Sequence, residues 1–389
     1  MSTLQEKDKQ YVANTYARFP VELVSGKGSR VTDTDGKEYI DLGSGIAVTA
    51  FGIADDAWAS AVALQAAKLQ HTSNLYYTEP CAALAEMLCE KTGMKKVFFG
   101  NSGAEANECA IKLARKYAAD KKGDDVYTVV TMKNGFHGRT LTTLAATGQE
   151  HYHELFQPLT PGFVHAEPND LADFERIVSE TKVAGVLLEC VQGEGGVNVL
   201  DGDYVRGVAD VCAREDIILM IDEVQTGNGR TGTLYAYMQY GIVPDVVTTA
   251  KGLGGGLPIG ACMMGEKVEA VLGFGDHGST FGGNPVCAAG ALSILSRMDG
   301  ALLDEVKEKG KYIRSALEGA KGVKSVSGLG LMIGVEPENK PASEIVKKCM
   351  QNGVLCLTAK NKVRLLPALN IPVEDLKAAV EVLLAAFAE

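Results

Sequence analysis

Residues Ile217–Leu257 read IILMIDEVQTGNGRTGTLYAYMQYGIVPDVVTTAKGLGGGL, and two patterns within them indicate the architecture. The apolar runs Ile217–Ile221 and Val246–Thr249 are short, rich in β-branched residues and without helical spacing, which is typical of buried strands in a parallel sheet. Asp222 directly follows the first run, and Lys251 follows the second after one residue. Polar residues just past such strands face the crevice where ligands bind, so we expect Asp222 and Lys251 to share a site.

Strand and helix patterns alternate along the rest of the chain. Before this stretch, they predict strands at 96–99, 126–131 and 183–189, and helices at 55–70, 80–92, 101–116, 171–180 and 203–214. After it, they predict helices at 301–321, at 342–352 and from 373, and strands at 323–335, 354–357 and 363–366. This alternation predicts an α/β protein with a three-layer α/β/α arrangement around a mostly parallel sheet.

The chain is long enough for more than one domain, because single cores stop growing at roughly 250–300 residues and this chain has 389. Alternation around an Asp-Gly turn predicts a hairpin at 30–41. We interpret the Gly-rich run 273–283 as a hinge. We therefore expect an N-terminal segment (1–50) that packs with the small domain, a large domain (51–283) and a small C-terminal α/β domain (284–389).

Composition excludes several classes of partner. A net charge of −11 argues against nucleic acids and anionic membranes, so we expect small-molecule substrates. The N-terminus lacks an apolar signal region, and no apolar run approaches the ~18 residues of a membrane helix, so we expect a cytoplasmic protein. Nine cysteines without C-x-x-C predict neither disulfides nor zinc. We interpret His151 and His153 as loop residues and expect no metal.

The segment Asn101–Ala104 lies between a predicted strand and a predicted helix. Free amides and the helix dipole make such a position suitable for an anion such as phosphate, which would involve Ser102, Gly103 and Ala104. Ser102 with Glu105 three residues later is equally typical of a capping box that binds no ligand.

Two Gly-rich loops add polar side chains. The first contains Phe136, His137 and Arg139, which could supply a stacking face and a carboxylate clamp, or could be a turn with one surface arginine. The second follows the strand 183–189 and contains Glu189 and Glu194 among glycines, which either bring the backbone close to a ligand or merely form a loop.

The segment Gly227–Gly232 formally matches the dinucleotide-binding motif G-x-G-x-x-G. Five residues separate its first glycine from the preceding strand, and the acidic residue Asp222 precedes the motif instead of following it by about twenty residues. These differences disfavour a nicotinamide site.

Lys251 precedes a Gly-rich bend, where burial would lower its pKa and free its lone pair for an imine. A surface lysine is the ordinary alternative. Pyridoxal phosphate needs a lysine, an acid for its pyridine nitrogen and an anion site for its phosphate. Lys251, Asp222 and the 101–104 segment supply all three at strand ends of one predicted sheet.

Seven motifs together resemble the class-III, fold-type-I pyridoxal-phosphate aminotransferases, with the acetylornithine aminotransferase branch nearest. They are NSGAEANECAIKLAR (101–115), FHGRTL (136–141), VQGEGGV (191–197), IDEVQTGNGRTG (221–232), AKGLGGGLPIGA (250–261), HGSTFGGNP (277–285) and VRLLP (363–367). The resemblance extends from about Gly26 to the C-terminus. The chain departs from the family in lacking a Gly-His-x-His-Pro segment after Val48 and in having Ala368 where a second proline is usual.

The resemblance implies a role for each matching residue. Lys251 would carry pyridoxal phosphate as a Schiff base, and Asp222 would pair with the ring nitrogen. The other cofactor-binding residues would be Ser102, Gly103, Ala104, Phe136, His137, Val224 and Gln225, with Thr280 reaching the phosphate held by the neighbouring subunit of a homodimer. The substrate-binding residues would be Arg139 for the ω-amino substrate's carboxylate, Arg364 for the α-carboxylate of glutamate, Glu194 to neutralise Arg364, and Glu189 and Ser279.

The resemblance also implies the reaction, namely transfer of an amino group from N2-acetyl-L-ornithine to 2-oxoglutarate in arginine biosynthesis. Ornithine, succinylornithine, 4-aminobutyrate and acetyl-lysine remain alternative donors, because Arg139 requires only a carboxylate. From other classes, a cofactor-binding protein without transaminase activity and a nicotinamide-dependent dehydrogenase remain open.

Overall fold

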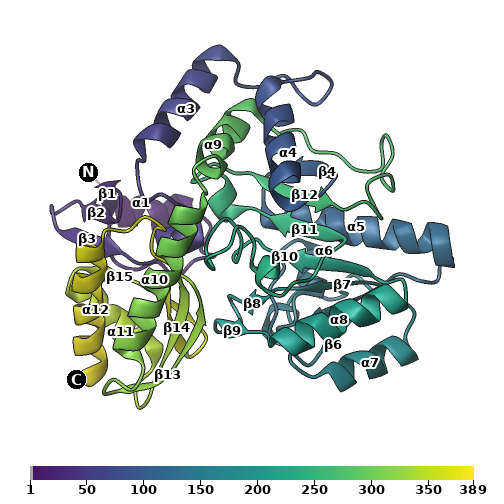
Figure 1. Ribbon diagram of the computed structural model, residues 1–389. Coiled ribbons are helices and arrows are strands. Elements are labelled where there is room, and N and C mark those ends of the chain that lie inside the picture. Colours follow the sequence, from purple (N-terminus) through teal and green to yellow (C-terminus); the bar gives the residue numbers. More distant parts are fainter. Residues whose placement is uncertain (1–2) are drawn as a thin grey trace.

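A seven-stranded sheet forms the centre of the protein in the computed structural model, which describes residues 3–389 (Figure 1). In order across the sheet the strands are β4 (Lys96–Gly100), β12 (Gly260–Met264), β11 (Val246–Thr249), β10 (Ile218–Asp222), β7 (Val183–Leu188), β5 (Thr128–Met132) and β6 (Phe163–Ala166). Neighbours from β11 to β6 run parallel, whereas β12 is antiparallel to both β4 and β11. The expected mostly parallel sheet is confirmed.

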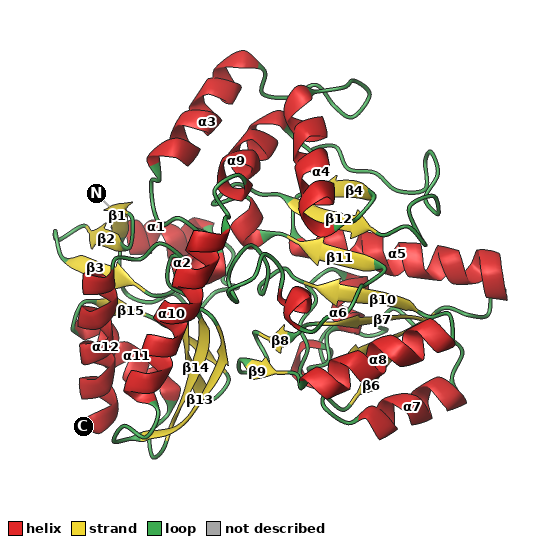
Figure 2. Ribbon diagram, in the orientation of Figure 1, coloured by secondary structure: helices red, strands yellow, loops and turns green. Residues whose placement is uncertain are grey.

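Helices cover both faces of this sheet, as Figure 2 shows. The side chains of β10 alternate between the two faces, because successive residues of a strand point to opposite sides. Ile218 and Met220 pack in one buried cluster with α5 (Gly103–Lys122), whereas Leu219 and Ile221 pack in another with α7 (Leu171–Glu180) and α8 (Gly202–Arg214). Two separate cores, one on each face, make the three-layer arrangement.

The remaining helices near this sheet pack against one another. The helix α3 (Asp56–Lys68) and the helix α4 (Glu79–Thr92) both contact α9 (Pro285–Leu295). Short helices precede and interrupt the sheet: α1 (Leu4–Tyr11), α2 (Ser44–Ala47), α6 (Leu141–Ala146), and the 3-10 turns η1 (Glu150–Tyr152), η2 (Ala236–Gln239) and η3 (Lys251–Leu253).

The two ends of the chain meet in a second part of the molecule. A four-stranded sheet joins β1 (Leu23–Lys27), β2 (Arg30–Asp33) and β3 (Glu38–Asp41) to β15 (Val354–Leu355), and β15 runs parallel to β3. Figure 1 shows these N-terminal strands beside the C-terminal helices. The predicted hairpin at 30–41 is confirmed, whereas the predicted domain boundaries stay predictions.

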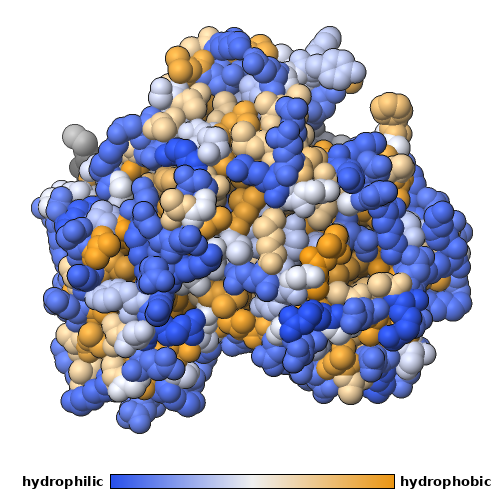
Figure 3. Space-filling model, in the orientation of Figure 1, coloured by the Kyte–Doolittle hydropathy of each residue, from blue (hydrophilic) through white to orange (hydrophobic). Residues whose placement is uncertain are grey.

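A third sheet completes the C-terminal region. It orders β13 (Val323–Leu329), β14 (Met332–Pro337), β17 (Lys362–Leu365) and β16 (Leu357–Ala359), accompanied by α10 (Gly300–Leu317), α11 (Ala342–Gln351) and α12 (Val373–Ala388). A two-stranded ribbon, β8 (Val191–Gln192) with β9 (Asn198–Val199), lies between this region and the central sheet. Figure 3 shows that the surface is hollowed between these two parts of the molecule.

The sequence patterns did not predict two strands of the seven-stranded sheet, β12 in its interior and β6 at its edge. The strand β12 (GACMM) contains glycine and alanine and runs antiparallel, so it lacks the β-branched character expected of a buried parallel strand. The strand β6 has only four residues. Among the described residues, no single helix has the length and apolar composition to cross a membrane, although α9 and α10 meet that test together as a pair bent by 73°.

Glu223, immediately after β10, holds the segment that follows this strand in place through hydrogen bonds. Its fully buried carboxyl accepts hydrogen bonds from Thr226 Oγ1 (2.5 Å) and the Tyr237 amide (2.8 Å). Burial raises the pKa of Glu223 to about 7, although these donors and the Ala236 amide oppose the rise. The folded protein therefore holds this proton to a higher pH than the unfolded chain does.

This raised pKa makes stability depend on pH. Below the ordinary pKa near 4.5 the contribution of Glu223 is fully present, and it is lost as pH rises through about 7, by about 3 kcal/mol in total. We expect Glu223→Gln to remove this loss, so that its thermal midpoint declines less than that of the unmodified protein between pH 4.5 and 7. Parallel thermal curves for the two proteins across that range would contradict the assignment.

Candidate active site

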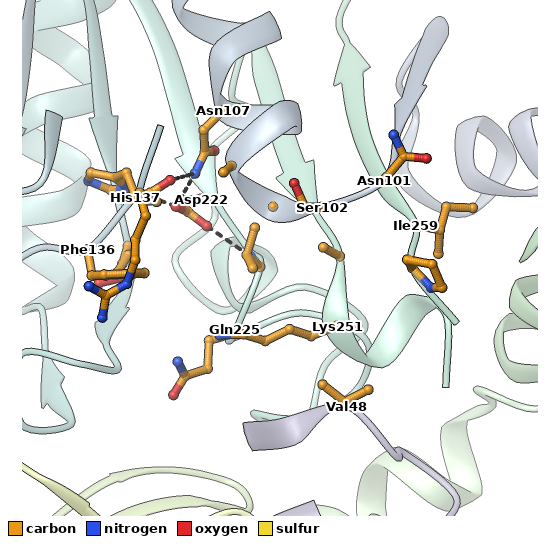
Figure 4. A pocket seen from close by; sticks show the side chains of 18 of the residues that line it. Val48, Asn101, Ser102, Asn107, Phe136, His137, Asp222, Gln225, Lys251 and Ile259 are labelled. Atoms are coloured by element: carbon orange, nitrogen blue, oxygen red, sulfur yellow. Dashed lines mark hydrogen bonds and ion pairs between the residues drawn. The ribbon is translucent and has the colours of Figure 1, made fainter. Parts of the chain in front are cut away.

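Asp222 and Lys251 lie in one cavity of about 490 Å³ beyond the carboxyl ends of β10 and β11 (Figure 4). The cavity also contains nine other residues that the sequence singles out: Ser102, Gly103, Ala104, Phe136, His137, Arg139, Glu189, Val224 and Gln225. The strand order places these residues together, because parallel strands end at the same edge of the sheet.

The carboxylate of Asp222 is 3% exposed and is surrounded by donors. Its Oδ2 accepts a hydrogen bond from Asn107 Nδ2 (2.8 Å) and lies 2.8 Å from His137 Nδ1, and its Oδ1 accepts one from the Val224 amide (3.0 Å). Figure 4 shows Asn107 and His137 converging on this carboxylate. Such donors offset the cost of burying the group, and its negative charge remains available to a cation in the cavity.

Asn107 is a residue that sequence reasoning missed. It lies on α5, and its Nδ2 also donates to the His137 carbonyl (2.8 Å), while Thr248 Oγ1 of β11 donates to its Oδ1 (2.7 Å). The only signal in the sequence is a polar residue on a helix face that otherwise buries alanine, cysteine and isoleucine. Asn107 thereby ties a helix, a loop and two strands to one carboxylate.

Lys251 reaches the cavity from a strained turn. Its backbone is left-handed (φ +44°), which is uncommon for any residue other than glycine and is typical of functional sites. Burial lowers the pKa of Lys251, Glu194 opposes that change, and Arg364 reinforces it. Within residues 3–389 its amine donates no hydrogen bond. A lysine of lowered pKa is suited to form an imine.

The N-terminus of α5 opens onto the same cavity. Ser102 is the N-cap and accepts a hydrogen bond from the Glu105 amide (3.2 Å), so the expected cap is present. The amides of Gly103 and Ala104 have no acceptor within the described residues, and with the dipole of a 20-residue helix they form an anion site. A Cβ on Gly103 would lie 2.6 Å from Val224, so only glycine fits.

Arg139 lies at the exposed side of the cavity with two aromatic rings beside it. Its guanidinium carbon is 5.7 Å from the ring centre of Phe136 and 4.7 Å from that of Tyr152, which sequence reasoning did not single out. Arg139 forms no ion pair with any acidic side chain in residues 3–389. An exposed, unpaired arginine supported by aromatic faces is able to bind a carboxylate.

Arg364, in contrast, is paired. It lies on β17, is 3% exposed, and its Nη1 is 2.5 Å from Glu194 Oε1 and 3.1 Å from Gln225 Oε1. Burial would raise the pKa of Glu194, but Arg364 outweighs burial and holds that pKa below its ordinary value. The pair is therefore ionised at neutral pH, and Gln225 connects it to the cavity.

Glu189 is a second buried acid near Asp222. Its Oε2 has no hydrogen-bond partner in the part of the chain that the structure describes. Burial, followed by the charge of Asp222, raises the pKa of Glu189 well above its ordinary value. Asp222, with three hydrogen-bond partners, is therefore the better compensated of the two buried acids.

Comparison with known families identifies the site. The model of the family described as aminotransferase class-III matches residues 11–387. The chain belongs to the class-III aminotransferases.

Relatives of this aminotransferase cover nearly its whole length. The acetylornithine aminotransferase of Haemophilus ducreyi is 52% identical over 98% of this chain and 97% of its own, and that of Caldanaerobacter subterraneus is 46% identical over 97% of each. The solved N-acetylornithine aminotransferase of Stenotrophomonas maltophilia superposes with a TM-score of 0.86 at 35% identity, covering 99% of this chain and 98% of its own. The ornithine aminotransferase of Toxoplasma gondii has a TM-score of 0.95 at 32% identity, covering 100% and 95%.

The cofactor of this aminotransferase is pyridoxal phosphate, and the residues present fit it. The lysine of lowered pKa suits the aldehyde carbon, the compensated carboxylate of Asp222 suits a protonated ring nitrogen, and the free amides of α5 suit the phosphate. When bound, the cofactor supplies an electron sink for the bonds of the substrate's amine-bearing carbon. The fold is the one expected of fold type I.

Four residues singled out in the sequence do not line this cavity. Arg364 and Glu194 lie beside it, in contact with Gln225, whereas Ser279 and Thr280 lie on a separate loop. Ser279 Oγ accepts hydrogen bonds from Asn101 Nδ2 (3.2 Å) and the Gly282 amide (2.9 Å), and Thr280 is exposed on the same loop. Their assignments to the substrate and to a neighbouring subunit's phosphate stay predictions.

Asp222→Asn tests the charge at the ring nitrogen, because asparagine keeps the size of the side chain and removes its charge. We expect the rate at saturating substrates to fall by about a hundredfold, or about 3 kcal/mol. The matched control is Asp203→Asn, which removes a fully exposed carboxylate on α8 and should leave the rate unchanged. Equal rates for the two variants would contradict the role of Asp222.

Proposed function

We propose that the protein transfers the δ-amino group of N2-acetyl-L-ornithine to 2-oxoglutarate, giving N-acetylglutamate 5-semialdehyde and glutamate. The observation that carries this proposal is the contrast between the two arginines, since Arg139 is unpaired at the cavity and Arg364 is neutralised by Glu194. A donor with one carboxylate far from its reacting amine needs one free arginine. The relatives named acetylornithine aminotransferase support the choice of donor.

In this proposal the two arginines serve the two substrates in turn. Arg139 binds the carboxylate of acetylornithine while Glu194 keeps Arg364 neutralised, so that the apolar part of the donor meets no buried free charge. For glutamate or 2-oxoglutarate, which carry two carboxylates, Glu194 moves away and Arg364 binds the α-carboxylate. Gln225 contacts both members of the pair and accommodates either arrangement.

The reacting proton is assigned to Lys251. Burial lowers the pKa of Lys251, which favours its role as the general base that removes the proton from the amine-bearing carbon of the substrate. Asp222 would hold the proton on the ring nitrogen of a bound cofactor through its opposite charge. Phe136 and Val224 line the cavity and would confine the ring, and burial raises the pKa of the neighbouring Glu189.

A homodimer with shared active sites belongs to the same proposal. The loop of Thr280 is exposed, and the apolar side chains Phe281, Leu75 and Tyr77 near it are 58%, 87% and 106% exposed. Asn74 Nδ2 connects the two segments by donating to the Ser279 carbonyl (3.0 Å). We assign this surface to the partner subunit and Thr280 to the partner's phosphate. The nine free thiols favour a reducing compartment, and we place the enzyme in the cytoplasm.

A donor series tests the proposed substrate. With 2-oxoglutarate as acceptor, we expect kcat/KM for N-acetylornithine to exceed that for ornithine and 4-aminobutyrate by at least about tenfold, or about 1.4 kcal/mol. Succinylornithine and acetyl-lysine test the acyl group and the chain length. Equal or higher kcat/KM for any of the other donors would reassign the substrate within the same chemistry.

Arg139→Lys is the matched variant for that series, because lysine keeps the charge and loses the planar fork that binds a carboxylate in two places. We expect its KM for the donor to rise about tenfold with little change in the absorbance of the bound cofactor. An unchanged KM would show that Arg139 does not bind the donor's carboxylate.

A further inference from the structure

The 227–232 loop, Gly227–Gly232, is buried although it is polar. It connects β10 to η2, and its side chains Asn228, Arg230 and Thr231 are 3%, 2% and 3% exposed. Loops that carry charged side chains ordinarily lie at the surface, so the partners of these groups indicate what the loop does. The loop opens no α-helix, which removes the helix terminus that a dinucleotide motif requires.

One end of the loop contacts the turn that carries Lys251. Asn228 Nδ2 donates hydrogen bonds to Thr249 Oγ1 (2.9 Å) and to the carbonyl of Ala250 (3.1 Å), the residue directly before Lys251. Asn228 is itself left-handed (φ +56°), and a Cβ on Gly252 would lie 3.1 Å from it. The loop therefore fits closely around the strained lysine turn.

The other end contacts the C-terminal region next to Arg364. Arg230 Nη1 donates to the carbonyls of Pro367 (2.6 Å) and Leu331 (3.1 Å), and the Leu331 amide donates back to the Arg230 carbonyl (3.0 Å). Pro367 follows Arg364 by three residues, and Leu331 lies between β13 and β14. A single guanidinium thus connects the loop to the segment that directly follows β17, the strand that carries Arg364.

Arg230 is a costly group to bury. Burial lowers its pKa to about 9, so it remains charged at neutral pH, yet no carboxylate within residues 3–389 forms an ion pair with it. A buried charge compensated only by carbonyls costs stability unless its geometry serves a purpose. The carbonyl contacts fix the direction of the guanidinium, and through it the position of the 364–367 segment.

We infer that Arg230 is a positioning residue that sets the location of Arg364 relative to Lys251, and thereby determines affinity for the α-carboxylate of glutamate and 2-oxoglutarate. This inference rests on the proposed roles of Arg364 and Lys251 above. The donor's carboxylate is assigned to Arg139, which has no contact with the loop, so the effect of Arg230 is specific to the dicarboxylate substrates.

The test compares the two half-reactions in Arg230→Lys, loaded with cofactor. Lysine keeps the charge, but its shorter side chain ends before the position of Nη1, the guanidinium nitrogen that donates to both carbonyls. Rapid-mixing absorbance gives the apparent Kd and the limiting rate for glutamate and for N-acetylornithine separately. We expect the Kd for glutamate to rise at least about tenfold, the Kd for N-acetylornithine to stay within about twofold, and both limiting rates to change less than threefold.

A second variant separates positioning from a folding defect. A Cβ at Gly330 would lie 2.5 Å from the Thr231 carbonyl carbon and 2.8 Å from the Arg230 carbonyl oxygen, so Gly330→Ala moves the two loops apart without changing a charge. We expect the same selective loss for glutamate. Arg314→Lys is the matched control, because Arg314 Nη2 donates to the Gly328 carbonyl on the same hairpin but within the C-terminal region, and both Kd values should remain unchanged.

Hydrogen exchange provides a readout that does not require activity. In Arg230→Lys and Gly330→Ala we expect faster amide exchange in the 363–369 segment and unchanged exchange in β7. Equal weakening of both substrates, or no weakening of either together with unchanged exchange, would overturn the inference. If the unmodified protein responds to neither substrate, the proposed function fails, and faster exchange alone would still support the positioning role of Arg230.

Discussion

The site depends on one constraint, which is that the buried carboxylate of Asp222 must be supplied with hydrogen-bond donors. A charge 3% exposed at a strand end requires donors, and these come from α5 through Asn107 and from the 134–140 loop through His137. Asn107 is in turn bonded to Thr248 of the next strand. Because one carboxylate determines where these elements meet, the free amides of α5 and the ring of Phe136 are placed around the same space.

The second constraint is that, among the described residues, one of the two arginines has an acidic partner and the other has none. Arg139 is exposed and flanked by aromatic rings, whereas Arg364 is buried and forms an ion pair with Glu194. The site can therefore offer one carboxylate-binding group or two, depending on whether the Glu194 side chain stays paired with Arg364 beside the cavity. This difference explains how one site can serve a donor with one carboxylate and an acceptor with two, and it makes the position of Arg364 relative to Lys251 important for the acceptor.

Local sequence patterns predicted much of this arrangement. The strands that deliver Asp222 and Lys251 are short apolar runs, and the anion site has a helix cap, so both are recognisable without a structure. The resemblance to a known family added Arg364 and its pairing with Glu194, because the two residues are 170 positions apart and share no local pattern. The sequence did not predict the roles of Asn107 and Tyr152, because these roles arise only from tertiary packing. The strand β12 (GACMM) was not predicted because it lacks the β-branched residues typical of a buried parallel strand.

The most direct test of the site is to locate the lysine that binds the cofactor. The protein loaded with pyridoxal phosphate is reduced with borohydride, digested and examined by mass spectrometry, which identifies the lysine that carries the pyridoxyl group. The expected result is a single modified residue, Lys251, together with loss of the cofactor's absorbance change on adding glutamate. A pyridoxyl group on any other lysine, or none on Lys251, would contradict the assignment of the active site.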